Sequence, residues 1–408
     1  MKVLQLSTLL CLAFSTLTFA NENNNTLDSF ISDLKRKQFE YDYGKNEAES
    51  SKLRDSWIAP LQLNYSYTRS KPFSEELTSQ SAAIRMDQPI FQSGGIYYGI
   101  KFANASRLYT NYTIDVAKRK MIKDTVSILM QLKQTALKIK AQKLQIENSE
   151  INLAQKKEQY LNGQLDSGFL DNAIIQRNIV IQALYDIETA QEKLLNKFSI
   201  LSDLDPRDTQ VPHLELINLE DFLAHNIVLK QKNAEIKKSE YQKDITVAKY
   251  LPRVNLTAGY SWNNTEQQFD ATYPAFKNDA QYYDYGVRVN IPIDLNTFRD
   301  IESVKIDFLK SQVVEKDKER ELKALFEQVL KNIENFDKKI ALSNDNIELY
   351  TKLSEDTKKL FSAGYKTQYD VDTLNNSLRI QELDSKVYEI DKQLELLNLY
   401  EMYVNEGK

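Results

Sequence analysis

Residues that commonly perform chemistry are scarce in this sequence of 408 residues. Its only histidines, His213 and His225, lie twelve residues apart, and its only cysteine, Cys11, lies near the N-terminus. This spacing matches no zinc motif, and the sequence contains no glycine-rich phosphate loop and no nucleophile elbow. We therefore expect no metal ion, no cofactor and no catalytic residue, and a protein that is not an enzyme.

The charge balance narrows the class of partners. The formal net charge is −5 and the sequence pI is about 5.5, with no basic block along the chain. Without such a block, the chain lacks the electrostatic field that gathers nucleic acid. Nucleic acid is therefore not an expected partner.

The first 20 residues predict a secretory signal peptide. Lys2 precedes an apolar run, and the run ends at the small-residue exit Thr18-Phe19-Ala20. Cleavage after Ala20 would remove Cys11, and Thr8 stands where a lipoprotein signal needs leucine, so we expect no lipid anchor. No other stretch has 18 consecutive apolar residues, which leaves strands as the only elements that could cross a membrane.

Glycine and proline are rare, at 10 and 8 residues, and this scarcity excludes turn-rich folds. The prolines form three groups: Pro60, Pro72 and Pro89; Pro206 and Pro212; Pro252, Pro274 and Pro292. The long proline-free stretches between and after these groups permit long helices. We expect helices over residues 95–161 and 297–361, each about 100 Å long at 1.5 Å per residue.

A seven-residue apolar repeat supports both long helices and indicates a duplicated chain. The repeat runs through Leu132, Ile139, Ile146, Leu153 and Tyr160, and recurs 201 residues later at Ile333, Ile340, Ile347, Ser354 and Phe361. Such a repeat is typical of coiled-coil-like packing. Each long helix ends at a glycine turn, containing Gly163 or Gly364, with Asp166 or Thr367 as the N-cap of a returning helix.

We expect residues 21–210 and 211–408 to be two structural repeats, each with a helix, a β-hairpin, a long helix, a tip turn and a return helix. The flanking helices should cover about residues 25–57, about 219–250 and about 368–405, and the first return helix should end at Leu201. The hairpins should cover about residues 58–91 and 251–293, where apolar and polar residues alternate with the strand period of two. Each strand should have roughly ten residues, which suffices to cross a bilayer when tilted.

A soluble, half-buried sheet is an alternative reading of these hairpins. Against it, aromatic residues cluster in them as in the interfacial girdle of a membrane barrel, for example at Tyr65, Trp262 and Tyr283. Four strands cannot close a barrel, so a membrane-spanning chain would have to oligomerise, with two, three or four copies giving 8, 12 or 16 strands. The helices would then extend the barrel into water as a tube.

Residues 88–95, QPIFQSGG, resemble the passage from hairpin to helix in the TolC family of outer-membrane efflux proteins. We expect Pro89 to end the strand, because it needs no ladder hydrogen bond, and Gly94 and Gly95 to permit the change of direction from barrel to helix. Pro292 holds the corresponding place after the second hairpin, where no glycine pair follows. The resemblance implies a mainly α-helical protein with a membrane β part: a homotrimer with a 12-stranded β-barrel continuous with a 12-helix periplasmic tunnel.

Residues 361–371, FSAGYKTQYDV, are similar to the helix-tip motif of the same family, and residues 160–170, YLNGQLDSGFL, match its first half. The resemblance implies that the tips close the tunnel and dock an adaptor protein, through residues that include Tyr160, Gly163, Phe361 and Gly364.

By position, Asp370 matches an aspartate that lines the family's tunnel entrance, and Lys366 matches a basic residue that latches the closed state. Three copies of Asp370 around one axis would favour cations. Alternatively, Asp370 only stabilises the first turn of its helix. Phe169 stands where a partner aspartate would lie, and Asp166 or Asp171 could take its place.

The expected function is the passive exit duct of a tripartite efflux system in the outer membrane of a Gram-negative bacterium, with most of the chain in the periplasm. The implied partners are a periplasmic adaptor, an inner-membrane pump and outer-membrane lipid, and multidrug efflux is the first expectation for the cargo. The outer-membrane component of a type I protein secretion system is one alternative. A trimeric coiled-coil surface adhesin is another.

Overall fold

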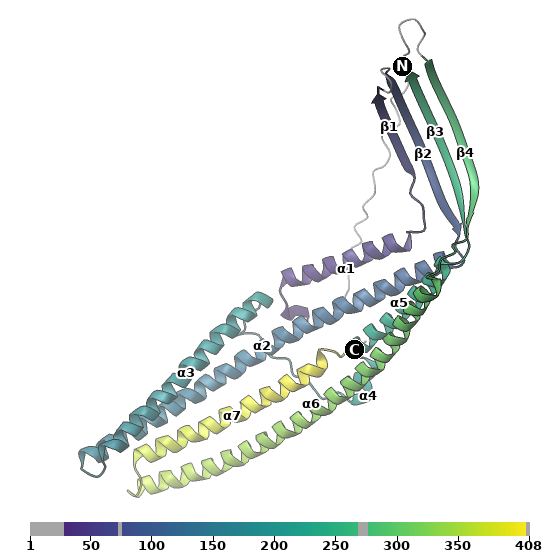
Figure 1. The fold of residues 1–408 in the computed structure, drawn as a ribbon. Helices are drawn as coiled ribbons and strands as arrows, with labels where there is room; N and C mark the ends of the chain where they lie inside the picture. Colours follow the sequence, from purple (N-terminus) through teal and green to yellow (C-terminus); the bar gives the residue numbers. More distant parts are fainter. Residues whose placement is uncertain (1–27, 72–75, 268–275, 405–408) are drawn as a thin grey trace.

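The computed structural model describes residues 28–71, 76–267 and 276–404. The predicted signal peptide over residues 1–20, together with Pro72 and Pro274, lies outside these described residues. The molecule is elongated, with a curved β-sheet at one end and long helices extending to the other (Figure 1).

Two helices, α2 (Gly95–Leu161) and α6 (Thr297–Ser362), run from the sheet to the far end. Their observed ends match the predicted ends, except that α6 continues for one residue past Phe361. The remaining helices are α1 (Asp33–Arg54), α3 (Ser167–Leu201), α4 (Leu219–Ala224), α5 (Ile227–Lys249) and α7 (Gln368–Tyr400), with a short 3-10 turn at Asp28–Phe30. The long, uninterrupted helices follow from the absence of proline and from the caps at their ends.

The helices pack side by side in two successive rows that share α2 and α6. Near the sheet the row is α1, α2, α5, α6, and toward the far end it is α3, α2, α7, α6 (Figure 1). Each long helix therefore has a different short neighbour in each half of its length. As a result, α3 and α6 are the outermost helices of the row that carries the tips.

The main hydrophobic core lies where these two rows meet. Its most deeply buried side chains include Leu129 of α2, Phe198 of α3, Phe222 of α4 and Leu399 of α7. The heptad residues Leu132 and Ile333 belong to this core. Ser354, the one polar member of the repeat, is 4% exposed and donates a hydrogen bond to Asn375 Oδ1 on α7 at 2.7 Å, so a polar residue is satisfied inside the packed seam.

One predicted helix is wrong: residues 219–250 form two helices, not one. The break falls at His225 and Asn226, where the Asn226 side chain accepts hydrogen bonds from the amides of Val228 and Leu229 and starts α5. The C-terminal segment pairs with the backbone groups at this break. The Ile227 amide donates to the Met402 carbonyl, and the Val404 amide donates to the His225 carbonyl. The same pairing ends α7 at Tyr400, five residues before the predicted end.

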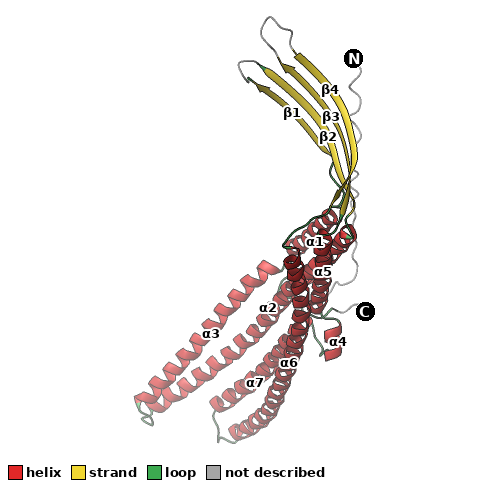
Figure 2. Cartoon of the chain, turned by 45° about the vertical axis from the view of Figure 1, so that its right-hand side comes forward, coloured by secondary structure: helices red, strands yellow, loops and turns green. Residues whose placement is uncertain are grey.

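The sheet contains β1 (Gln62–Ser70), β2 (Leu77–Phe91), β3 (Arg253–Gln267) and β4 (Phe276–Asn290). The strands are antiparallel in the order β1-β2-β3-β4, so the two hairpins form one sheet through the pairing of β2 with β3 (Figure 2). Three strands have 15 residues, more than the ten predicted, because the pairing continues into the polar ends of the hairpins. Within the described residues, the outer strands β1 and β4 each have an unpaired edge.

The two faces of the sheet differ in chemistry. On one face, Tyr260 pairs with Tyr283 and Leu256 with Val287; on the other, Arg288 forms a 2.7 Å ion pair with Asp87. Side chains alternate between the faces of a strand, so this division follows directly from the sequence. The predicted fold class is confirmed: the chain is mainly α-helical with a four-stranded sheet. None of the helices in the described residues is long and apolar enough to cross a membrane.

Candidate functional site: the helix tips and the barrel junctions

The two helix tips lie together at the end of the molecule farthest from the sheet (Figure 1). In each tip, the long helix ends at a glycine with positive φ, +70° at Gly163 and +79° at Gly364. The amide after each glycine bonds back five residues along the chain, from Gln164 to Gln159 and from Tyr365 to Leu360. This is the Schellman arrangement, which only glycine adopts without strain.

The return helices start with side-chain caps at the predicted residues. The Asp166 carboxylate accepts hydrogen bonds from the Gly168 amide at 3.2 Å and from the Ser167 hydroxyl at 3.1 Å. These bonds hold the pKa of Asp166 below its usual value, the backbone bond being the larger cause. Beside the tips, Tyr160 and Phe361 keep much of their side chains exposed at corresponding positions of α2 and α6.

Asp370 belongs to a capping box with Thr367. Its carboxylate accepts hydrogen bonds from the Thr367 amide and the Thr367 hydroxyl, both at 2.9 Å, while the Asp370 amide donates to that hydroxyl. The pKa of Asp370 is lowered, first by the Thr367 backbone bond, then by its side-chain bond. The other carboxylate oxygen lies 4.0 Å from Lys366 Nζ, so the predicted gate residues are close together within one tip.

Reasoning from sequence missed a polar contact between the tips. The Tyr369 hydroxyl on the first turn of α7 donates a 3.1 Å hydrogen bond to Glu158 Oε1 on the last turns of α2. This bond raises the pKa of the Tyr369 hydroxyl above its usual value. The contact joins the α2–α3 pair to the α6–α7 pair. No sequence signal indicates it, because Tyr369 and Glu158 are 211 positions apart and become neighbours only when the helices pack.

The first junction between sheet and helix is built by Pro89, Gly94 and Gly95. Strand β2 continues past Pro89 to Phe91 through an irregularity in its pairing with β3, so the proline does not end the strand. Gly94 has φ +91° and caps α2, and a Cβ there would lie 3.2 Å from the Tyr98 ring. Ser93, also at positive φ, donates a 2.7 Å bond to the Pro252 carbonyl and ties this junction to the start of β3.

The second junction uses different residues. After β4, Pro292 is half-buried, and the Asp294 carboxylate accepts a 2.8 Å bond from the Asn296 amide. The Asp294 carbonyl accepts bonds from the Thr297 amide and hydroxyl, which starts α6. Asn296, at the N-cap, makes no side-chain capping bond. An Asp-centred turn therefore replaces the glycine pair.

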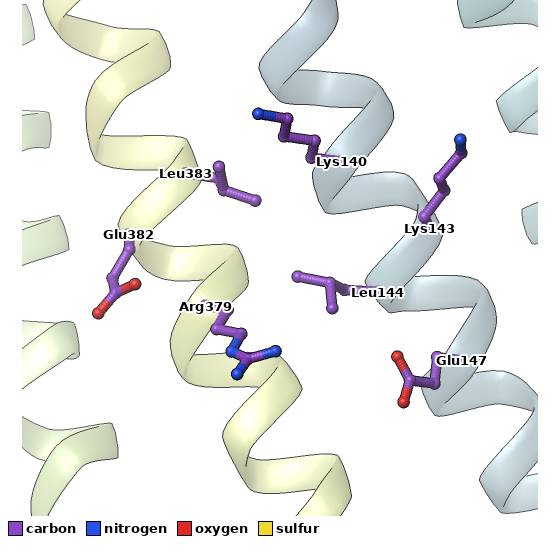
Figure 3. Close-up of a pocket in the computed structure, with 7 residues that line it drawn as sticks. All are labelled: Lys140, Lys143, Leu144, Glu147, Arg379, Glu382 and Leu383. Atoms are coloured by element: carbon purple, nitrogen blue, oxygen red, sulfur yellow. The ribbon is translucent and has the colours of Figure 1, made fainter.

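A shallow hollow of about 460 Å³ lies above the tips, between α2 and α7 (Figure 3). Leu144 and Leu383 point toward each other near its centre. Charged side chains surround them: Lys140, Lys143, Glu147, Arg379 and Glu382. Within the described residues, no group of three His, Cys, Asp or Glu side chains could hold a metal ion.

A long helical body joined to a four-stranded sheet is an architecture also found in several solved outer-membrane channels. The structure resembles the outer membrane protein VceC from Vibrio cholerae (TM-score 0.70, 14% identity, 93% of this chain and 95% of that chain). It also resembles the Campylobacter jejuni CmeC outer membrane channel (TM-score 0.71, 12% identity, 93% and 86%) and the Neisseria gonorrhoeae MtrE outer membrane channel (0.64, 11%, 92% and 88%). These likenesses establish the fold.

Part of the sequence also matches a family model. Residues 218–401 match the model described as outer membrane efflux protein. The chain thus contains an outer membrane efflux protein domain over somewhat less than half of its length, and it shares the fold of solved outer-membrane channels over 93% of it. Among curated protein sequences, none matches the chain. The expected resemblance to outer-membrane efflux proteins is thus confirmed, and that family is one of channel proteins, not of enzymes.

Proposed function

We propose that three copies of the chain form the exit duct of a tripartite efflux system, closed at rest by the helix tips and without enzymatic activity. The observation that carries this proposal is the pair of unpaired sheet edges, β1 and β4, at opposite sides of the sheet. An open edge is not tolerated in lipid, so β4 of one copy must pair with β1 of the next. Three copies of the four-stranded sheet give 12 strands (3 × 4).

The helices support the same closure. Exposed apolar residues gather on α3 and α6, the two outermost helices of the tip-side row: Ile174, Ile175, Ile179 and Tyr185 on α3, and Leu342, Leu349 and Leu353 on α6. A cyclic assembly places α3 of one copy beside α6 of the next and covers both surfaces. We propose accordingly that residues 21–210 and 211–408 act as two structural repeats, each of which contributes half of the protomer's wall.

The tips are the proposed site of gating and adaptor docking. Tyr160, Gly163, Phe361 and Gly364 lie at the far end of the tube, and the Leu144–Leu383 hollow above them suits a helical hairpin from an adaptor, with apolar contacts at its centre and charges at its rim. Cargo would be driven by an inner-membrane pump, because the duct itself consumes no energy.

The first experiment is to purify the protein in mild detergent, heat it, and record currents in planar bilayers. A sheet-rich trimer that dissociates on heating and conducts ions supports the proposal. A monomer, or a rod-like helical trimer without conductance as the adhesin alternative requires, overturns it. Secretion of a protein substrate with an adaptor and an ATP-driven pump would instead favour the type I secretion alternative.

The entrance ring has its own test. We propose that Asp370 faces the tunnel axis, with Asp166 or Asp171 replacing the family partner at Phe169, and that Lys366 helps to hold the tips closed. Asp370→Asn should weaken block of the conducting trimer by divalent cations or polyamines, because three negative charges leave the entrance. Asp356→Asn, an exposed carboxylate near the end of α6, serves as the matched control. Unchanged block in Asp370→Asn would remove that residue from the ring.

A further inference from the structure

The apolar face of β4 does not stop where the strand stops. Alternate residues from Tyr283 onward are all apolar and continue past the last ladder residue, Asn290: Tyr283, Tyr285, Val287, Val289, Ile291, Ile293 and Leu295. The residues between them are Asp284, Gly286, Arg288, Asn290, Pro292, Asp294 and Asn296. The alternation of the sequence therefore persists through the connection to α6, where no strand among the described residues pairs with it.

The side chains of this extension are almost fully exposed in the single chain. Ile293 and Leu295 are each 96% exposed, and Phe298 on the first turn of α6 is 83% exposed. Asp294 between them is also exposed, but its carboxylate and carbonyl accept hydrogen bonds from the residues that start α6. The fold thus engages the polar side chain in hydrogen bonds and leaves the two large aliphatic side chains almost fully exposed.

Length arithmetic shows why a membrane protein needs this extension. The apolar row from Tyr283 to Ile291 covers eight residue steps, about 26 Å along a strand and about 20 Å along the membrane normal at a tilt near 40°. The apolar band of an outer-membrane barrel is about 25 Å tall. Ile293 adds up to about 5 Å and brings the row to that height.

We propose that Ile293 and Leu295 anchor the protein in the periplasmic leaflet of the outer membrane, with the lipid interface as the partner that covers them. They continue the lipid-facing row of β4 and lie at its periplasmic end. Phe298 and the exposed Arg299 follow directly, an aromatic ring and a guanidinium suited to the headgroup region and its phosphates. This inference rests on the proposed membrane barrel and adds a segment outside its strands.

Single-cysteine variants can locate each residue, because Cys11, the sole native cysteine, lies in the predicted signal peptide. The variants are Ile293→Cys and Leu295→Cys, with Asp294→Cys as the water-facing control and Val287→Cys as the lipid-facing control. Each purified full-chain trimer is spin-labelled in phosphatidylethanolamine–phosphatidylglycerol vesicles. Collision of the label with oxygen, which enters lipid, is compared with collision with a water-soluble nickel chelate.

Labels at residues 293 and 295 should give oxygen-to-nickel ratios well above the ratio at 294 and approaching that at 287. A ratio equal to that at 294 would place both residues in water and overturn the proposal. Protection from both reagents would show that a neighbouring copy covers them and would overturn it as well. If Val287→Cys itself lacked lipid exposure, the proposed barrel would fail, and that result is distinguishable from failure of the anchor alone.

Discussion

The two helix tips share a backbone and differ in the side chains that it presents. Positions 201 residues apart carry the same turn, with Gly163 matching Gly364 and the N-cap Asp166 matching Thr367. The second tip then has Lys366, Tyr369 and Asp370 where the first has Leu165, Gly168 and Phe169. The duplicated turn therefore reverses the helix in both tips, whereas the Lys366–Asp370 pair and the donor of the hydrogen bond to Glu158 belong to the second.

The two junctions between sheet and helix, unlike the two tips, use different turns. The first changes direction at Gly94 with positive φ, and the second does so through hydrogen bonds to Asp294. The chain can replace one turn chemistry by another where the connecting path is free to vary. At the tips, both halves keep the glycine turn.

The largest effect is expected from substitutions that break this shared glycine turn. Gly163→Ala and Gly364→Ala should each destabilise their tip by about 1–2 kcal/mol, because an L-residue at positive φ is strained. No atom of the described residues would lie within 4 Å of a Cβ at either site, so the two changes should be equal. Protection of the Gln164 and Tyr365 amides in hydrogen exchange should fall by about 5–30-fold.

The matched control is Gly99→Ala, at a helical glycine of α2 that also has open space around its Cβ. This change should stabilise the helix by roughly 0.5–1 kcal/mol. If only one tip variant lost protection, the backbone equivalence of the two tips would be wrong.

The next largest effect concerns the hydrogen bond from Tyr369 to Glu158, whose donor occurs only in the second tip. Tyr369→Phe removes its hydrogen bond to Glu158 and should favour the open state by about 0.5–1.5 kcal/mol. Mean conductance of the trimer at low voltage should rise accordingly. Tyr365→Phe, on the same tip but 80% exposed, is the control and should leave conductance unchanged.

A double-variant cycle sharpens this prediction. Glu158→Ala should have an effect similar to Tyr369→Phe, and the two changes together should add little, because they remove the same bond. Full additivity would show that the two residues act independently.

A smaller effect is expected from Lys366→Ala. Its partner Asp370 lies at 4.0 Å and both side chains are substantially exposed, so the pair should contribute about 1 kcal/mol or less. The change in conductance should be smaller than for Tyr369→Phe and should fade as salt is added. A larger, salt-resistant change would show that Lys366 contacts a neighbouring copy and not only its own tip.

The sequence was sufficient to predict the features that depend on nearby residues. Helices α2 and α6 end at the expected glycines because a glycine turn and the following N-cap are local signals. The two hairpins were expected because alternation is also local, although three of their four strands proved longer than predicted.

Features that depend on distant residues could not be predicted in the same way. The break at His225 and Asn226 requires pairing with residues 402–404, and the Tyr369–Glu158 bond joins residues 211 positions apart. Ser354 looked like an exception to the heptad repeat, and its hydrogen bond to Asn375 explains why it is tolerated. In each case the relevant partner is fixed by the packing of helices and not by local sequence.

The smallest expected effect is the acid response of the tips. It distinguishes an Asp370 that only caps its helix from an Asp370 that lies in an entrance ring. Asp166 and Asp370 both have lowered pKa values in the single chain. A carboxylate with a lowered pKa stabilises the fold above its unfolded-state pKa of about 4, and this stabilisation is lost as pH falls through the folded-state pKa. Amide protection at both tips should therefore decline in acid, below about pH 4.

In the trimer the two tips should differ if Asp370 faces the axis. Three nearby carboxylates repel one another and raise the pKa of Asp370 relative to that of Asp166, so the second tip should lose protection at the higher pH. Asp166→Asn, which retains a good N-cap, should abolish the acid response of the first tip with little change at neutral pH. Equal midpoints for the two tips in the wild-type trimer would assign Asp370 to helix capping alone, and the asymmetry of the tips would then rest on Tyr369.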